Sequence, residues 1–199
     1  MSRTRKKIKP HFSIGIFCEG ASEKQYFDML NKKYRRGNVV TTYHTKIKVK
    51  DAGASGRKLI ETANQHQKQE KFDQVYVVFD RDDHSRAELQ HCEKLAERYN
   101  IKVIFSSISF EIWILMHFES VMKSYTRKGL YQKLSGKKYF GQDYRRFKGS
   151  DYSKYLEDKV QTAKLNAELL YQKNNKIYDD DPFTNVDKAI KEIYDIDQF

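Results

Sequence analysis

The chain has 199 residues, with 38 Lys or Arg against 27 Asp or Glu, 39% hydrophobic residues and 33% charged residues. This composition excludes a disordered chain and indicates one globular domain, or one domain with an elaborated tail, that has a heavily charged surface. The net charge of +11 favours polyanionic partners, and the longest apolar stretch, 108–118, is too short to span a bilayer. Because no signal-peptide pattern follows the basic start, we expect a cytoplasmic protein.

Hydrophobic patterning predicts four successive repeats of a strand followed by a helix. The predicted strands cover residues 12–18, 42–50, 75–79 and 101–105. The predicted helices begin near Ser22, Arg57, Ser85 and Ser109. This alternation predicts an α/β fold with a parallel sheet of about four strands flanked by helices, whose functional loops lie at the carboxyl ends of the strands. Cys18 and Cys92 fall in regular structure, so we expect neither a disulfide framework nor a cysteine-based zinc site.

The composition changes near residue 120, and we divide the chain there. Residues 1–119 are expected to form the catalytic core with a basic N-terminal arm, and residues 120–199 a basic, aromatic-rich helical extension that packs on the core. Lys and Arg neutralise phosphates while Tyr and Phe stack on unpaired bases, which predicts nucleic-acid binding by this extension. The alternative is a solvated surface over a Tyr-rich core. The cations expected to bind nucleic acid are Lys137, Lys138, Arg145, Arg146 and Lys148.

Acidic residues follow two of the predicted strands. Glu19 directly follows the strand at 12–18, and Glu23 lies four residues later, about one helical turn along the chain. Asp80 and Asp82 follow the strand at 75–79. Because the carboxyl ends of parallel strands meet at one edge of a sheet, these four carboxylates converge if the first and third strands are neighbours.

Four converging carboxylates predict a site for a divalent cation. Two unit charges about 4 Å apart repel by about 4 kcal/mol at an effective dielectric constant near 20, so such a cluster needs protons or cations. Oxygen ligands suit Mg²⁺ or Mn²⁺, and these ions also bridge substrate phosphates. In a protein of charge +11, the combination indicates metal-assisted hydrolysis of a phosphodiester. The alternative is that the acids only cap helices and interact with helix dipoles.

These motifs resemble two known groups of proteins. EGASE after one strand and FDRDD after another are similar to the Toprim signature shared by topoisomerases, primases and old-type (OLD) nucleases. Over nearly the whole chain, the order of motifs resembles the RloB-like family. The motifs that carry this resemblance are the basic start (3–10), EGASE (19–23), FDRDDH (79–84), SFEIWILMHF (109–118) and DPFTNV (181–186). Ser22 replaces the more usual Thr and Asp181 the more usual Asn, and neither change removes a catalytic group.

The resemblance implies a Toprim-like (Rossmann-like) core and metal-dependent nuclease activity in bacterial phage defence or abortive infection. It also implies a partner ATPase of the ABC or AAA type encoded nearby. Glu19 would be the general acid/base or the carboxylate that positions the metal, and Asp80 and Asp82 would be magnesium ligands. Glu23 would complete the site as in old-type nucleases. No topoisomerase tyrosine domain or primase zinc module is expected in a chain of this length.

Other residues near the motifs have more than one interpretation. Glu111 is expected either to reach the metal cluster as a fifth acid or to support the site through hydrogen bonds, and Asp83 and His84 are expected to support it through hydrogen bonds. Helix-dipole or structural roles explain these residues as well. His84 and His117 can shuttle protons, although a histidine near an acid is more often structural. The glycine-containing loop before Arg57 can hold a phosphate through its amides and Arg57, or it can be an ordinary turn with a helix cap.

The expected function is therefore divalent-metal-dependent hydrolysis of DNA or RNA. The expected partners are nucleic acid and the ATPase, with no membrane partner, and a homo-oligomer is left open. One alternative is a non-catalytic module that binds nucleic acid or the ATPase. Another is an RNA-processing Toprim ribonuclease, but the similarity to that enzyme covers the acidic motifs only.

Overall fold

The structure is a computed structural model that describes residues 12–37, 46–81, 84–196 and 199. Within these residues, five strands form one sheet in the order β2-β1-β3-β4-β5. The strands are β1 (Ser13–Cys18), β2 (Lys46–Asp51), β3 (Gln74–Asp80), β4 (Ile101–Ser107) and β5 (Phe183–Thr184). The first four strands run parallel to their neighbours, and β5 pairs antiparallel with β4. The sequence-based prediction of an α/β fold with a mostly parallel sheet is therefore confirmed.

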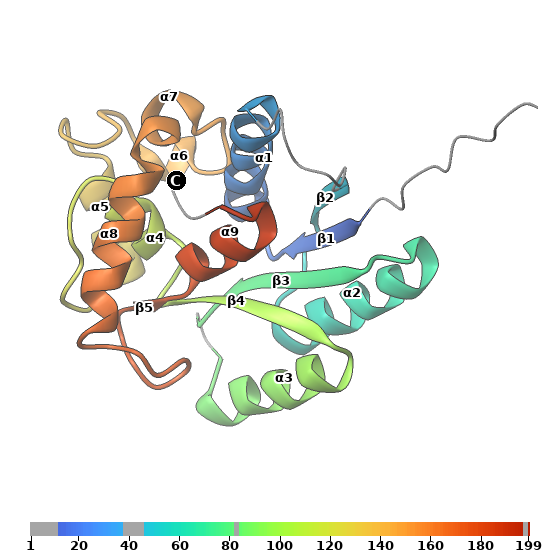
Figure 1. The fold of residues 1–199 in the computed structure, drawn as a ribbon. Coiled ribbons are helices and arrows are strands. Elements are labelled where there is room, and N and C mark those ends of the chain that lie inside the picture. The colour runs from blue at the N-terminus through green and yellow to red at the C-terminus, as the bar shows by residue number, and fades with distance from the viewer. Residues whose placement is uncertain (1–11, 38–45, 82–83, 197–198) are drawn as a thin grey trace, which may run out of the picture.

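Helices cover both faces of this sheet and gather beyond the carboxyl ends of its strands (Figure 1). The first three helices in the chain are α1 (Ala21–Gly37), α2 (Gly56–Glu70) and α3 (Arg86–Arg98). The later helices are α4 (Glu111–Met116), α5 (Arg127–Leu134), α6 (Tyr144–Phe147), α7 (Ser153–Leu156), the 3₁₀ helix η1 (Glu157–Lys159), α8 (Val160–Tyr171) and α9 (Val186–Tyr194).

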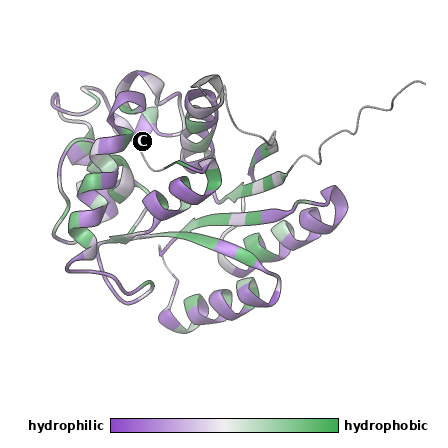
Figure 2. Cartoon of the chain, viewed as in Figure 1, coloured by the Kyte–Doolittle hydropathy of each residue, from purple (hydrophilic) through white to green (hydrophobic). Residues whose placement is uncertain are grey.

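Two hydrophobic clusters, one on each face, hold the sheet. In β3, Val75, Val77 and Phe79 belong to the cluster shared with α2 and α3. The alternate residues Tyr76 and Val78 belong to the cluster shared with α1, α4, α8 and α9. A strand covered on both faces must be apolar at every position, which explains the continuous run VYVVF. Figure 2 shows hydrophobic residues along the strands and largely hydrophilic outer sides on α2 and α3.

The extension after residue 119 contributes to the same sheet and core. Its strand β5 pairs with the end of β4, and the Asn185 side chain accepts a hydrogen bond from the Phe105 N–H (2.7 Å) and donates one to the Val103 carbonyl (3.0 Å). The apolar faces of α8 and α9 lie in the cluster that contains Trp113, which is fully buried. The segments before and after residue 120 therefore differ in composition but contribute to the same hydrophobic core.

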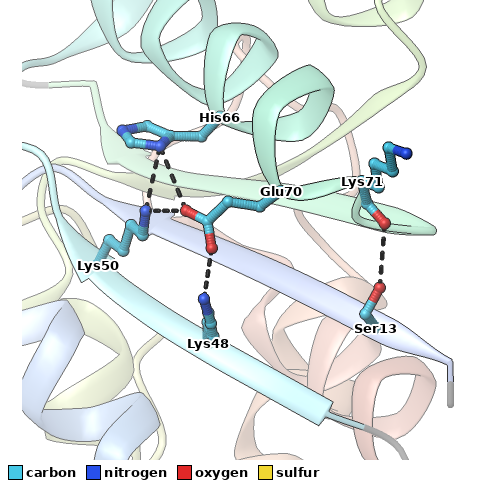
Figure 3. A network of polar contacts seen from close by, with 6 residues as sticks. All are labelled: Ser13, Lys48, Lys50, His66, Glu70 and Lys71. Carbon is cyan, nitrogen blue, oxygen red and sulfur yellow. Dashed lines mark hydrogen bonds and ion pairs between the residues drawn. The ribbon is translucent and has the colours of Figure 1, made fainter.

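The edge strand β2 is held to α2 by a charged network (Figure 3). The Glu70 carboxylate pairs with the Lys48 ammonium (2.5 Å) and with the Lys50 ammonium, and the His66 ring lies beside the same oxygen (3.4 Å). The side chains of Lys48 and Lys50 leave β2 on the same side because successive residues of a strand alternate. One carboxylate from α2 therefore meets both lysines.

Several expectations from the sequence can be compared directly with these elements. Cys18 and Cys92 are both buried and free, as expected. The predicted strand at 42–50 begins at Lys46 among the described residues, and residues 42–45 lie outside them. The helix expected from Ser109 to about 118 is shorter, at Glu111–Met116. In the described part of the chain, every helix is too short or too polar to cross a membrane.

Candidate functional site

Acidic side chains from three neighbouring strands meet at one cavity. Glu19 directly follows β1, Asp80 is the last residue of β3, and Glu111 begins α4 after β4. Glu23 joins them from the first turn of α1. The cavity they share has a volume of about 160 Å³. Its lining consists of Glu19, Ala21, Ser22, Glu23, Asp80, Ser109, Glu111, Arg127, Tyr131 and Lys148.

The Glu19 carboxylate is positioned by hydrogen bonds from two neighbouring loops. Its Oε2 accepts a hydrogen bond from the Ser55 hydroxyl (2.8 Å) and a longer one from the Asp80 N–H (3.4 Å). The Ser55 oxygen also lies 2.8 Å from Nε2 of His84. Ser55 precedes α2 but makes no side-chain cap to that helix, so its hydroxyl is committed to Glu19 and His84. The loop after β2 thus contributes to the site through Ser55.

Gly56 allows His84 to lie against this loop. Its φ is +52°, a conformation that residues with a Cβ rarely adopt. A Cβ at this position would also lie 2.9 Å from the His84 ring. The glycine in this loop is therefore required for the close approach of His84 and Ser55.

Asp80 is a buried carboxylate of the cavity whose charge is unfavourable where it lies. Its residue is 7% exposed, and its Oδ1 is buried without a hydrogen-bond partner among the described residues. Burial raises the pKa of Asp80 well above its ordinary value, and the charges of Glu23 and Glu111 raise it further. An unpartnered, buried carboxylate oxygen is costly, and it marks a position where a cation or proton is expected.

Glu23 and Glu111 share the cavity and repel each other. Burial raises the pKa of Glu23 to about 7, with further contributions from the charges of Glu111 and Glu19. Oε2 of Glu23 accepts a hydrogen bond from the Gly20 N–H (3.2 Å), and Oε2 of Glu111 accepts one from the Ser109 hydroxyl (2.7 Å). These bonds fix the orientation of both carboxylates toward the cavity.

Lys148 supplies a positive charge at the mouth of the cavity. Its ammonium lies 3.7 Å from Oε1 of Glu111, donates a hydrogen bond to the Tyr131 hydroxyl (2.8 Å), and lies 5.1 Å from the centre of the Tyr131 ring. The next residue, Gly149, has a φ of +79°, and a Cβ there would lie 3.0 Å from Cβ of Ala21. This close approach brings the segment that carries Lys148 against the start of α1.

A larger and more open cavity adjoins the acidic one. We call it the basic groove; its volume is about 870 Å³ and its lining consists of Arg127, Lys128, Tyr131, Gln132, Ser135, Asp143, Arg145 and Lys148. Arg127, Tyr131 and Lys148 line both cavities. The site therefore has two connected parts, one dominated by carboxylates and the other by cations.

The structure brings some of the expected site residues together and separates others. Glu19, Glu23 and Asp80 share the acidic cavity, with Glu111 as a fourth acid, and His84 contacts Ser55 beside it. Asp82 and Asp83 lie outside the described residues. His117 is buried within the core, where it contacts the Tyr26 hydroxyl (3.0 Å), and burial lowers its pKa to about 3. This histidine is a neutral core residue.

The cations expected to bind nucleic acid fall into two groups. Arg145 and Lys148 line the basic groove. Lys137, Lys138, Arg146 and Arg57 line neither of the two cavities. Among these, Lys138 lies 3.5 Å from Glu119, Arg146 pairs with Asp143 and Arg57 pairs with Glu61.

Several residues of the site are not among those predicted from the sequence. Ser55, Arg127, Lys128 and Tyr131 all lie in or beside the two cavities. Thr126 caps α5 by accepting a hydrogen bond from the Gly129 N–H, and this Thr is the sequence signal for the helix start. Position in the sequence alone could not show that α5 faces the acidic cavity.

The donor atoms suit a hard divalent cation, because carboxylate oxygens are the ligands that Mg²⁺ and Mn²⁺ prefer. In the described ranges, no three His, Cys, Asp or Glu side chains are arranged so that they could hold one metal ion. The carboxylates converge on a common cavity without forming a closed coordination shell.

Comparisons with known proteins place the chain in a family. No curated protein and no solved structure gives a significant match. A family model described as RloB-like protein matches residues 14–193, which include both the sheet and most of the helical extension. With nearly its whole length matched, this chain belongs to the RloB-like protein family.

Proposed function

We propose that this chain is a divalent-metal-dependent nuclease of the Toprim type that hydrolyses phosphodiester bonds of DNA or RNA. The main support is the acidic cavity, where Glu19, Glu23, Asp80 and Glu111 converge from the carboxyl ends of three parallel strands. This edge of a parallel sheet is where α/β proteins bind ligands. Buried carboxylates whose pKa values are raised by burial and by neighbouring acids, as at Glu23 and Asp80, are also typical of functional sites.

The residues present fit a divalent cation. Oδ1 of Asp80 is buried and unpartnered, and the other potential ligands are carboxylate oxygens. We propose that Glu19, Glu23 and Asp80 hold the cation, together with Asp82 from outside the described residues. Because these side chains do not yet surround one point, the proposal requires them to approach each other when the ion binds. A bound Mg²⁺ would lower the pKa of a water ligand and offset negative charge on the leaving oxygen.

The protein's own groups would position the substrate around this centre. Ser55 holds the Glu19 carboxylate in a fixed orientation, which favours a defined geometry over a mobile one. The Lys148 ammonium lies between the basic groove and Glu111, so it is placed to bind a phosphate that enters the cavity. The burial of Asp80 and Glu111 lowers the effective dielectric constant around them, which strengthens their charge interactions.

We further propose that the nuclease acts in antiviral defence with a partner ATPase of the ABC or AAA type. The support for this part is membership of the RloB-like family. The partner would supply recognition or gating, because nothing in the acidic cavity by itself selects foreign nucleic acid.

The direct test is a cleavage assay with purified protein on plasmid DNA, single-stranded DNA and RNA, in Mg²⁺, in Mn²⁺ and in EDTA. Glu19→Gln and Asp80→Asn remove one charge each from the cavity with little change of shape, and Glu97→Gln makes the same change at an exposed position on α3. We expect cleavage by the wild type and Glu97→Gln in divalent metal, and loss of at least about a hundredfold in both cavity variants. Equal activity in all four proteins would refute the nuclease assignment.

A second candidate function is a non-catalytic module that binds nucleic acid. The arrangement of the described acids, which do not form a closed metal site, favours it. This module would bind nucleic acid equally well with and without divalent metal, with an affinity that falls steeply as salt rises. Binding of this kind with no cleavage of any substrate, measured in the presence of the partner ATPase, would favour this candidate over the nuclease.

A further inference from the structure

We infer that the basic groove binds a single, unpaired nucleic-acid strand and delivers it to the acidic cavity past Lys148 and Tyr131. The inference deepens the proposed nuclease function and rests on it, since it names the form of the substrate. Its first support is continuity. The groove and the acidic cavity share Arg127, Tyr131 and Lys148, so a chain lying in one reaches the other without crossing a barrier of core residues.

The second support is the charge of the groove. Among the described residues that line it, four are cations, namely Arg127, Lys128, Arg145 and Lys148, and one is an acid, Asp143. Asp143 is already engaged, because its carboxylate caps α6 through the Arg145 N–H (3.0 Å) and pairs with Arg146 (3.4 Å). Within the described part of the chain, neither Lys128 nor Arg145 forms an ion pair, and both are exposed.

Two cations elsewhere on the extension are paired with an acid. Lys133 and Lys138 both pair with Glu119, whose carboxylate also accepts a hydrogen bond from the Tyr139 hydroxyl. That carboxylate offsets part of their positive charge. Lys128 and Arg145 of the groove thus differ from Lys133 and Lys138, because no carboxylate of the described residues pairs with them and they are left available for phosphate groups.

The third support is the depth of the acids. Asp80 is 7% exposed, Glu23 is 6% exposed and Glu111 is 3% exposed, at the bottom of a cavity of about 160 Å³. At roughly 30 Å³ per water molecule, this cavity holds about five waters, or one phosphate group with its near surroundings. The phosphates of a rigid duplex cannot reach such a recess while both strands stay paired. A single strand can bend into it.

The size of the groove agrees with this limit. Its volume of about 870 Å³ lies within the range of pockets that enclose ligands of drug size. About one or two nucleotides fit in that volume. Tyr131 lies half-buried where the two cavities meet, and aromatic side chains beside cations are typical of surfaces that bind unpaired strands.

The test measures binding first, in EDTA, so that it does not depend on cleavage. Fluorescence anisotropy follows a labelled single strand of 12 nucleotides and the matching blunt duplex, each as DNA and as RNA. Lys128→Glu with Arg145→Glu reverses two groove charges, and Lys94→Glu with Arg98→Glu makes the same change of net charge on exposed positions of α3. Circular dichroism checks that both double variants remain folded.

We expect the wild type to bind the single strand at least about tenfold more tightly than the duplex. The groove variant should bind the single strand at least about tenfold more weakly than the control variant, with a salt dependence reduced by about two phosphate contacts. Equal binding by the two double variants would overturn the inference, and so would a duplex bound as tightly as the single strand.

Cleavage in Mg²⁺ then separates this inference from the proposed function. Cleavage by the wild type, with groove and control variants equal in KM and kcat, would support the nuclease function and refute strand binding in the groove. Groove-dependent binding of single strands without cleavage of any substrate would support the groove as a binding site and refute the nuclease function. Joint support requires a KM raised at least about tenfold in the groove variant, with kcat changed much less.

Discussion

Two glutamates in this protein show opposite responses to their surroundings. Glu70 lies between Lys48 and Lys50 on the edge strand, and hydrogen bonds from both ammonium groups lower its pKa to about 2 (Figure 3). Glu23 lies in the acidic cavity among other acids, where burial and the charges of Glu111 and Glu19 raise its pKa to about 7. One carboxylate is paired and contributes to the fold. The other is kept in a position that opposes folding.

The contrast shows that unfavourable charge interactions are kept in the acidic cavity. A buried carboxylate surrounded by like charges destabilises the folded state, and replacement by a neutral side chain would relieve it. The cavity nevertheless combines Glu23 with Asp80 and Glu111, and it leaves Oδ1 of Asp80 without a partner among the described residues. We interpret this destabilisation as evidence that the cavity binds a cation. Variants of the two regions should therefore differ in stability and in activity.

The largest expected effect is on stability at the cavity. The folded pKa of Glu23 is raised from 4.5 to about 7, so the fold favours its protonated form. Stability contributed by this group is therefore greatest below pH 4.5 and falls, on the order of 3 kcal/mol, as the pH rises to about 7. In Glu23→Gln this loss is absent. Urea denaturation in EDTA should show the variant equal to the wild type near pH 4.5 and clearly more stable at pH 8.

The comparison between variant and wild type reports the charge of Glu23 together with its effect on the neighbouring acids, because that charge also raises the pKa of Asp80. The glutamine carbonyl oxygen can still accept the hydrogen bond from the Gly20 N–H, so the variant changes charge with little change of shape. A stability difference that stays constant from pH 4.5 to pH 8 would show that Glu23 experiences no such repulsion.

A smaller effect is expected from Ser55→Ala, which releases the Glu19 carboxylate from one hydrogen bond. Loss of a group that orients a metal ligand typically lowers affinity or activity tenfold to a hundredfold, and we expect about tenfold here because the Asp80 N–H remains. Cleavage rate as a function of Mn²⁺ concentration measures the effect.

Ser85→Ala is the matched control for this variant. Ser85 forms a capping box with Glu88 at the start of α3, so its loss should lower stability by about 1 kcal/mol and leave cleavage unchanged. Ser55 makes no such cap, so Ser55→Ala should leave stability nearly unchanged. The reverse pattern, with Ser85→Ala impairing cleavage and Ser55→Ala impairing only folding, would contradict the assigned roles.

The smallest expected effect belongs to the paired glutamate. The lowered pKa of Glu70 means that its contribution to stability is present above pH 4.5 and is lost as the pH falls through about 2. Glu70→Gln should cost about 1 kcal/mol at pH 7, because ion pairs near the surface are screened by solvent. This loss of stability should disappear near pH 2, and the substitution should leave cleavage unaffected. Urea denaturation at the two pH values measures it, and an undiminished cost at pH 2 would show that ion pairing is not its origin.

Much of the architecture could be predicted from the sequence because its signals are local. The run VYVVF predicts a strand covered on both faces, and the capping residue Ser85 predicts the start of a helix. The meeting of Glu19 with Asp80 also followed from the sequence, since parallel strands end at the same edge of a sheet. The hydrogen bond from the Asp80 N–H to Glu19 confirms that these two segments adjoin.

Other parts of the site depend on contacts between distant segments and have no local signal. The strand β5 has two residues and carries no alternating pattern long enough to detect. Arg127 lines the acidic cavity, and Lys128 the basic groove beside it, only because α5 packs against α4, which the sequence of α5 does not encode by itself. Ser55 belongs to the glycine-containing loop before Arg57, and its hydrogen bond to Glu19 depends on that loop lying beside the end of β1 in the fold.

The central claim is that the acidic cavity binds a divalent cation, and isothermal titration calorimetry with Mn²⁺ tests it most directly. Wild type, Asp80→Asn and Glu70→Gln are compared at pH 7.5 without nucleic acid. We predict saturable binding by the wild type, equal binding by Glu70→Gln, and at least about tenfold weaker binding by Asp80→Asn. Binding of Mn²⁺ by Asp80→Asn as tightly as by the wild type, or no binding by the wild type at all, would contradict the claim.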